Sequence, residues 1–435
     1  MSEPGQRDRV EAVAIATLVL AALAARLAVV GISEVQPHRD GWIYVELAEG
    51  LASGAGLVRE GAPSIERPPG YPVFLALVLA AGGGMTSVAV LQAGLGALSA
   101  LLVLQLGLAM GFRGRAALVG AWGFALFPDL VVYPSFILTE TLWIFLALWG
   151  TVLGAQAAAG RRWRALPAGV CLGVACLVRS TTVIMVAAWV AFELLAWWRG
   201  RRDAIAPVAG LAVVAALVVL PWTIHASTLA GRLVVVDLTF DVSLRLGHHP
   251  GHLGDKAPVS VPPGQRDPVD LPLHDRARVH RSWGVSEILQ HPLDTAARTV
   301  MKLARVLHPR GDLELLDSIA LPRPGWWWLA STLATEVMLL ALLVGAARER
   351  RWRALSPALA VVVVVLVTTL LLHHAGRYRL PALVFLMPVA AHALDRSSPL
   401  SRRRMELLVT AHLAALALAT WLDLPRYVEN FHRLW

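Results

Sequence analysis

Charged side chains are scarce in this sequence. Asp, Glu, Lys and Arg together make up 16% of the 435 residues, whereas hydrophobic residues make up 57%. Soluble domains carry about 25% charged residues, so the composition argues against an ordinary soluble protein. Apolar runs of about 18 residues or more recur along the whole length, which is typical of a polytopic helical membrane protein.

An excess of acidic residues is also lacking, and the formal net charge is +9. A basic protein of this kind could bind nucleic acid. Its arginines, however, cluster in short loops between apolar runs, where basic residues set membrane topology. We therefore expect no nucleic acid partner and place five loops in the cytoplasm: 113–115, 161–164, 199–202, 348–353 and 396–404.

Cysteine is nearly absent, and the common catalytic motifs are missing. Cys171 and Cys176 lie in one apolar run at a spacing that puts them on different helix faces, so we interpret both as buried apolar residues. No Gly-rich phosphate loop, zincin helix or nucleophile elbow occurs. The pairs His248-His249 and His373-His374 resemble metal ligands, but adjacent histidines rarely share one ion, and no second ligand motif accompanies them. No metal is assigned, although a divalent cation stays open as a cofactor.

The apolar runs predict about 11 transmembrane helices, with a cytoplasmic N-terminus and an external C-terminus. The run 71–81 is too short to cross the bilayer and ends in three glycines, so we expect it to lie in the outer interface. The run 10–32 is too long for a signal peptide and is expected to remain as the first span. The expected spans are 10–32, 88–110, 116–127, 136–158, 165–178, 181–198, 204–223, 326–347, 355–372, 380–394 and 405–424.

The fold class is therefore an all-α polytopic membrane protein with two outer regions. The first is a loop of interfacial helices over 33–84, within an N-terminal catalytic module of residues 1–225. The second, 226–324, is a small mixed lid with an expected strand at 233–238 and helices from about 273 to 307. Residues 325–435 supply the C-terminal transmembrane helices.

Two polar motifs stand in the first outer loop: HRDGWIY at 38–44 and RPPGYP at 67–72. A carboxylate just beyond a membrane helix suits an enzyme whose substrate has a lipid tail and a polar reacting head. Asp40 could instead do no more than cap an amphipathic helix over 41–52. Both interpretations of Asp40 remain open from the spacing alone.

Other candidate residues fall on the same expected face. Glu140 lies about one turn inside the outer end of its run, and a carboxylate at membrane depth is a functional candidate by default. The alternative is a structural pair with a polar group of a neighbouring helix. Arg179 could likewise be a snorkelling side chain. Arg377 and Arg379 flank Tyr378 and suit a phosphate or diphosphate, or else only a lipid headgroup.

Several motifs in a fixed order resemble the GT-C membrane glycosyltransferases. The order is the Asp40 motif, the Pro-Pro-Gly turn, Thr139-Glu140, the 177–179 segment, the Pro-Trp-Thr-Ile stretch at 221–224, His291-Pro292 and the segment 377–381. The resemblance is closest to the bacterial branch related to protein O-mannosyltransferases and the lipid A aminoarabinose transferase. Ser180 and His225 depart from the family pattern, which leaves the acceptor open more than the reaction.

This resemblance implies transfer of a sugar from a polyprenyl-phosphate donor to a glycan, lipid or protein acceptor on the extracytoplasmic face of the cell membrane. Asp40 and Glu140 would be the catalytic acids. Arg179, Arg377 and Arg379 would bind the lipid phosphate, and the motif residues Tyr44, Arg67 and Tyr378 are expected to bind substrate as well.

A single general base without a covalent nucleophile favours direct displacement with inversion. The alternatives are a transporter or flippase of a lipid-linked glycan, which predicts inverted repeats and polar residues near the bilayer midplane, and a structural membrane scaffold.

Overall fold

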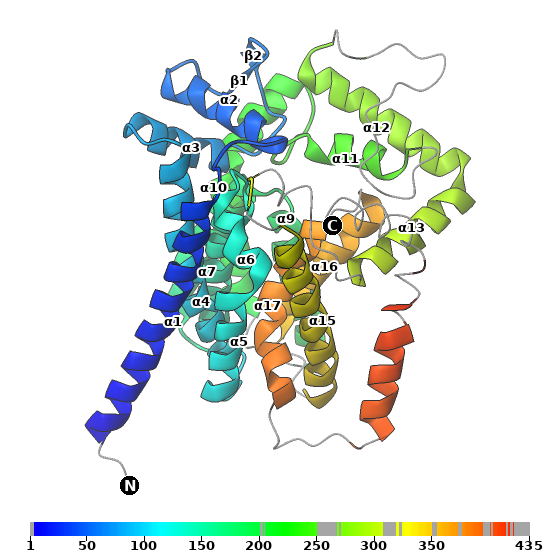
Figure 1. The fold of residues 1–435 in the computed structure, drawn as a ribbon. Helices are drawn as coiled ribbons and strands as arrows, with labels where there is room; N and C mark the ends of the chain where they lie inside the picture. Colours follow the sequence, from blue (N-terminus) through cyan, green and yellow to red (C-terminus); the bar gives the residue numbers. More distant parts are fainter. Residues whose placement is uncertain are drawn as a thin grey trace.

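The computed structural model describes residues 4–200, 203, 205–249, 268, 271–307, 319–321, 324–349, 355–372, 376–394, 401, 403–414, 416–417 and 421. The regular secondary structure of the described part is helical except for one short hairpin, which confirms the all-α class (Figure 1). The elements are α1 Pro4–Ile32, α2 Asp40–Ala52, β1 Val58–Arg59, β2 Ala62–Pro63, α3 Gly70–Ala80, α4 Met85–Ala109, α5 Gly114–Leu126, α6 Pro128–Val132, η1 Tyr133–Ser135, α7 Glu140–Ala158, η2 Arg162–Arg164, α8 Ala165–Val178, α9 Thr182–Trp198, α10 Ile205–Ala230, α11 Thr239–Gly247, α12 Leu273–Gln290, α13 Pro292–Leu307, α15 Pro324–Arg348, α16 Ser356–Leu371, η4 Gly376–Arg379, α17 Leu380–Ala391 and η5 His392–Leu394.

The long helices form one bundle, but fewer of the described helices are long enough to span a membrane than the sequence predicted. Within the described residues, five helices are long and apolar enough to cross a membrane: α1, α4, α7, α10 and α15. A sixth span results if α5 and the segment 128–135, which meet at a 57° bend, are counted together. The other expected spans form shorter helices, such as α8 with 14 residues and α17 with 12. A 14-residue helix is about 21 Å long, less than the roughly 30 Å of hydrocarbon.

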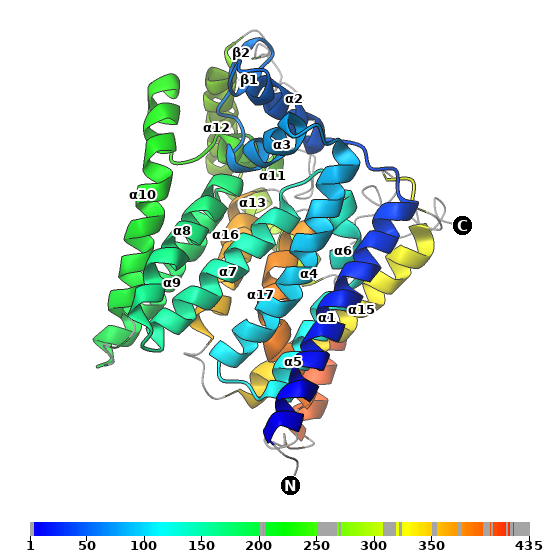
Figure 2. The same ribbon diagram turned by 90° about the vertical axis from the view of Figure 1, so that its left-hand side faces the viewer.

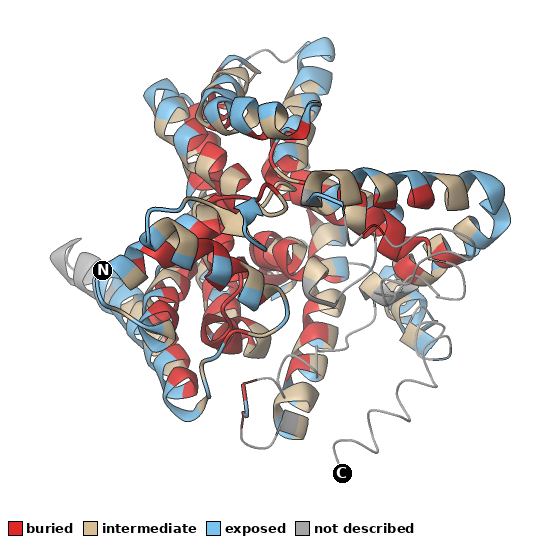
Figure 3. Cartoon of the chain, turned by 90° about the horizontal axis from the view of Figure 1, so that it is seen from above, coloured by how far each residue is buried: buried red, intermediate tan, exposed pale blue. Residues whose placement is uncertain are grey.

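The elements that lie outside the bundle of long helices gather at one end of it. Figures 1 and 2 show α2, α3, the β1–β2 hairpin, α11 and α12 at the end opposite to the N-terminus. The helix α3 has 11 residues, as expected for the short run 71–81. Seen from this end in Figure 3, buried residues concentrate where the helices meet and exposed residues cover the outside. The arrangement produces one polar end on an otherwise apolar bundle.

The β1–β2 hairpin was not predicted. Arg59 pairs with Ala62, and the two residues between them, Glu60 and Gly61, have φ values of 52° and 76°. Positive φ at both central residues is what a two-residue hairpin turn of the primed type requires. The strands have two residues each, too short to give an alternating pattern in the sequence.

The expected strand at 233–238 is wrong, and with it the mixed character of the lid in its described part. This segment is irregular and packs against α10, whose side chains satisfy its backbone. Trp222 Nε1 donates to Val236 O at 2.6 Å, and Thr223 Oγ1 donates to Val235 O at 2.6 Å. The helix α10 also continues to Ala230 instead of ending at residue 223, and Ser227 in this extension accepts a hydrogen bond from Val234 N at 3.0 Å.

A buried arginine explains how the bend after α5 is tolerated. Arg26 of α1 is 0% exposed and donates to Ala125 O at 3.0 Å and Phe124 O at 3.4 Å. Pro128 has no N–H, so the last carbonyls of α5 cannot all be satisfied within a continuing helix. The guanidinium of Arg26 replaces these missing donors.

We expect Arg26→Met to lower thermal stability clearly, because a buried carbonyl without a partner costs about 1–3 kcal/mol. Thermal unfolding of the purified protein in detergent measures the effect, with the exposed Arg115→Met as the control. An unchanged melting temperature for Arg26→Met would show that the bend does not need the guanidinium.

Candidate functional site

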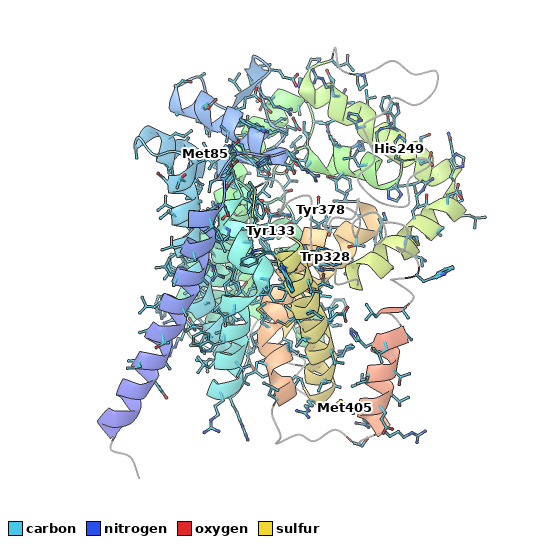
Figure 4. The ribbon with its side chains drawn as sticks, viewed as in Figure 1. Met85, Tyr133, His249, Trp328, Tyr378 and Met405 are labelled. Carbon is cyan, nitrogen blue, oxygen red and sulfur yellow. The ribbon has the colours of Figure 1, made fainter. Side chains whose placement is uncertain are left out.

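A polar pocket of about 110 Å³ lies at the polar end of the bundle. Its walls come from segments far apart in the sequence: α2, the turn before α3, the start of α7, the α8–α9 junction, the α10–α11 connection, α16 and the start of α17. Figure 4 shows Tyr378, one of the lining residues, where the bundle meets the layer of outer helices. The lining residues with polar side chains are Asp40, Tyr44, Arg67, Thr139, Glu140, Trp143, Arg179, Ser180, Thr181, Asp237, Thr239, Ser243, Thr368 and Tyr378.

Asp40 is the first residue of α2, and the N-cap residue is Arg39, with φ 50° and no side-chain capping bond. The expectation that Asp40 occupies the N-cap is therefore wrong. The start of α2 lies close to the segment leading into α7: a Cβ on Gly41 would be 3.0 Å from the carbonyl oxygen of Ile137. Glycine at this position lets the helix carrying Asp40 approach the helix carrying Glu140.

A second close approach fixes the Pro-Pro-Gly turn. A Cβ on Gly70 would lie 2.8 Å from the carbonyl oxygen of Leu177, near the end of α8. The next residue, Tyr71, is fully buried, and its hydroxyl donates to Gln92 Oε1 at 3.1 Å. Gln92 in turn donates to the carbonyl of Phe136 at 2.9 Å. The turn is thereby locked between α8 and the segment before α7, and it holds Arg67 beside the pocket.

Arg67 connects Asp40 with the first residue of α11. Its Nη2 donates to Asp40 Oδ1 at 3.1 Å, and its Nη1 lies 3.5 Å from Thr239 Oγ1. Burial alone would lower the pKa of Arg67, but the carboxylates around it, including Asp40 and Asp237, act in the opposite direction, and its pKa lies above the ordinary value. The guanidinium therefore stays charged.

Tyr44 lies one helical turn after Asp40, on the same face of α2. Its ring meets that of Tyr71 edge to face, with centroids 5.2 Å apart. Burial raises the pKa of Tyr44 to about 12; the charge of Arg67 acts in the opposite direction. The phenol is thus a hydrogen-bond donor, and not an acid, near neutral pH.

Glu140 and Arg179 form the second ion pair of the pocket. Glu140 is the first residue of α7 and only 4% exposed. Its Oε1 accepts from Arg179 Nη1 at 2.8 Å, and the same nitrogen lies 3.1 Å from Thr139 Oγ1. Arg179 has an extended backbone where α8 ends, and its guanidinium stands over the ring of Trp143 at 6.0 Å. The predicted pair of Glu140 with a polar group of a neighbouring helix is present, and Glu140 lines the pocket.

In the segment around Tyr378, one of the expected site residues lines the pocket. Tyr378 lines the pocket, whereas Arg379 is 4% exposed and is not among the lining residues. The side chain of Arg377 lies outside the described residues, as does the pair His373-His374. His248 is bonded to the carbonyl of Leu371 at 3.2 Å, and burial lowers its pKa to about 4.

Sequence reasoning missed the acid on the far side of Arg67. Asp237 lines the pocket and accepts a hydrogen bond from Thr239 Oγ1 at 2.8 Å. Burial raises the pKa of Asp237, while bonds from Thr239 and Ser180 and the charge of Arg67 act against this. The available signal was an aspartate that follows the apolar stretch 233–236. Because the expected strand at 233–238 included this aspartate, it was not considered as a site residue.

The fold resembles solved membrane transferases, although no protein-family model and no curated protein matches the sequence. The archaeal oligosaccharyltransferase AglB from Archaeoglobus fulgidus, in complex with an inhibitory peptide and a dolichol-phosphate, aligns with a TM-score of 0.55 and 15% identity over 96% of this chain and 55% of its own. ArnT from Cupriavidus metallidurans, bound to undecaprenyl phosphate, aligns with a TM-score of 0.52 and 17% identity over 94% of this chain and 64% of its own.

The chain thus spans between about half and two thirds of these structures. Nearly its whole length takes part in the match, so the likeness concerns the bundle and its polar end together. The chain has the GT-C fold that these membrane glycosyltransferases share.

Proposed function

We propose that this chain is an integral membrane glycosyltransferase that moves a sugar from a polyprenyl-phosphate donor to a glycan, lipid or protein acceptor. The observation that carries the proposal is a single pocket joining two acids to two arginines, Asp40 with Arg67 and Glu140 with Arg179, at the polar end of an apolar bundle. The two solved relatives of similar fold contain a dolichol-phosphate and an undecaprenyl phosphate.

Asp40 is proposed as the general base. An acceptor hydroxyl is a poor nucleophile near neutral pH, so a carboxylate within hydrogen-bond reach assists its attack. The side chain of Asp40 is 17% exposed and lines the pocket, which supports this role. Arg67 holds it in place from one side. Direct displacement by the acceptor would invert the configuration at the sugar carbon.

Arg179 is proposed to bind the donor phosphate. The leaving phosphate gains charge during transfer, and a fixed guanidinium stabilises that charge. Glu140, Thr139 and the ring of Trp143 surround Arg179, which supports a preorganised position. Glu140 would act in catalysis through its contact with Arg179 and its own place in the pocket wall.

Arg377 and Arg379 remain proposed phosphate ligands. Lysine keeps the charge but loses the two-pronged geometry of arginine, so Arg→Lys at either position should weaken donor use and Arg→Ala should weaken it further. Donor titrations of the purified variants measure this effect. Unchanged apparent donor affinity and rate in both Ala variants would limit these arginines to headgroup contact or packing.

No step is assigned to a metal ion. AglB has been solved in complex with Zn and sulfate, but the part of this chain that the structure describes holds no group of three or more His, Cys, Asp or Glu side chains placed to share an ion. The acids of the pocket face arginines instead. Loss of activity on treatment with a chelator would contradict this assignment.

We place the pocket on the extracytoplasmic side of the cell membrane. The basic loops at 113–115 and 161–164 lie between helices at the end away from the pocket, as the positive-inside rule requires for cytoplasmic loops. In intact cells, an impermeant thiol reagent should label Glu60→Cys and Arg278→Cys but not Arg113→Cys or Arg162→Cys. Labelling of position 113 or 162 from outside would reverse the topology.

The reaction itself is tested by incubating the purified protein with a panel of polyprenyl-phosphate sugars. We expect released polyprenyl phosphate with one or a few of the sugars, in the presence of a glycan, lipid or peptide acceptor. Release with none of the donors would contradict the proposed function.

A further inference from the structure

The helix α13 exposes apolar side chains and buries charged ones. Leu293 and Val300 are 84% and 59% exposed, whereas Arg298 and Lys302 are 6% and 0% exposed. A helix on the surface of a soluble protein turns its apolar side inward and its charged side outward. α13 does the opposite at these four positions.

The reversal follows the helical repeat. With 3.6 residues per turn, Leu293, Ala296, Ala297 and Val300 form one stripe, and all four are exposed. The opposite side of the helix carries the buried charges. The exposed apolar stripe therefore belongs to a continuous face, and it does not result from scattered single residues.

The buried charges fix which way α13 faces. Lys302 Nζ donates to Leu370 O at 3.2 Å and to Leu372 O at 3.0 Å, at the carbonyl end of α16. A cation is favoured there, because the last carbonyls of a helix have no partner within it and carry partial negative charge. Rotation of α13 to hide its apolar stripe would break both bonds.

Arg298 adds a second anchor on the same side. It donates to the carbonyl of His248 at 2.9 Å and to Glu287 Oε1 at 3.0 Å. α13 is thereby tied to α11, α12 and α16 through its charged side, so its orientation is set by three elements.

Two elements in contact with α13 also expose apolar side chains. Near α13, the end of α16 exposes Leu366, Leu370 and Leu371 at about 40% each, and α12 exposes Leu289 at 74%. Figure 1 shows α12 and α13 reaching sideways past the bundle, with α13 on the side nearer to the long helices, and Figure 3 shows the same sideways reach from above. An apolar surface that continues from the flank of a membrane bundle faces the same solvent as that flank, which is lipid.

We infer that α13 lies in the interfacial layer of the membrane leaflet at the pocket end, with Leu293 and Val300 among the acyl chains. The inference does not depend on the proposed reaction. The inference has a consequence for the pocket, because Lys302 of α13 donates a hydrogen bond to the carbonyl of Leu372, and Leu372 lines the pocket. The leaflet would thus hold one wall of the pocket in position.

The test uses single cysteines that carry a spin label in the full chain, reconstituted in vesicles of phosphatidylcholine and phosphatidylglycerol. Cys171 and Cys176 are first replaced by alanine. Labels at positions 293, 297 and 300 are compared with two controls: Leu217→Cys, on the exposed side of the span α10, and Arg278→Cys, on the exposed side of α12.

The measured quantity is the accessibility of each label to dissolved oxygen and to a water-soluble nickel chelate. We expect labels on α13 to behave like position 217, reached by oxygen and protected from nickel, while position 278 shows the reverse. Nickel access at 293 and 300 equal to that at 278 would overturn the inference, since the stripe would then face water. Protection from both agents would overturn it as well, because a protein surface would then cover the stripe. Thermal unfolding of each labelled variant confirms that it is folded, and three positions on one stripe guard against a single failed variant.

Discussion

Replacement of Asp40 by Asn is expected to lower the rate of sugar transfer by about 10²-fold or more, because general base catalysis contributes roughly 10²–10⁴-fold. Asn has nearly the same size, and its amide oxygen can still accept the bond from Arg67 Nη2. It cannot take a proton from the acceptor. The rate of polyprenyl phosphate release, measured with the best donor from the panel, quantifies the effect.

The matched control is Glu49→Gln, which neutralises an exposed acid on the same helix outside the pocket. It should leave the rate unchanged, and both variants should unfold at the temperature of the unmodified protein. If Asp40→Asn keeps most of the turnover, Asp40 only anchors Arg67, and the assignment of the base is wrong.

Replacement of Arg179 by Met should lower the maximal rate by about 10²–10³-fold, the usual effect of losing one donor to a developing oxyanion. Arg179→Lys keeps the charge but loses the fork, so we expect an intermediate rate. Turnover at saturating donor is the relevant measurement, because the proposed contact strengthens as the phosphate leaves.

Loss of Arg179 also leaves Glu140 buried without this partner, which by itself could destabilise the fold. The double variant Arg179→Met with Glu140→Gln removes both charges and separates the two effects. It should restore the unfolding temperature but not the rate. Recovery of the rate in the double variant would reduce the pair to a structural role.

The sequence was most informative where chemistry is local. The apolar runs predicted the five described helices that are long enough to span a membrane, and the short run at 71–81 indeed forms the short helix α3. Gly54 and Gly56, with φ values of 82° and 88°, follow the end of α2, where glycine commonly ends a helix. Such features depend on neighbouring residues alone, so a single sequence contains them.

Contacts between distant segments were less accessible. Asp40, Glu140 and Arg179 line one pocket. The glycines Gly41 and Gly70 permit the close backbone approaches that bring these segments together. No local residue pattern predicts such an approach. Asp237 was missed for a related reason. The stretch before it resembles a strand, but its backbone is satisfied by side chains of α10. The residue pattern does not show whether the backbone of such a stretch bonds to another strand or to side chains of a helix.

The number of spans also depends on information beyond composition. α8 and α9 meet at a short break containing Arg179, and each has fewer than 18 residues. Whether such a pair crosses the bilayer depends on the helices around it and on local bilayer thickness. The span count of about 11 therefore remains a prediction, while the position of the α8–α9 junction at the pocket is a feature of the structure.

The most direct test of the central claim follows both halves of one donor. The purified protein is reconstituted in vesicles with a polyprenyl-phosphate sugar labelled in the sugar and a lipid or peptide acceptor. We predict that the carrier phosphate is released while the label enters a new linkage on the acceptor, and that both events stop in Asp40→Asn. An intact lipid-linked sugar that has only crossed the bilayer would contradict the proposed transferase and identify a transporter.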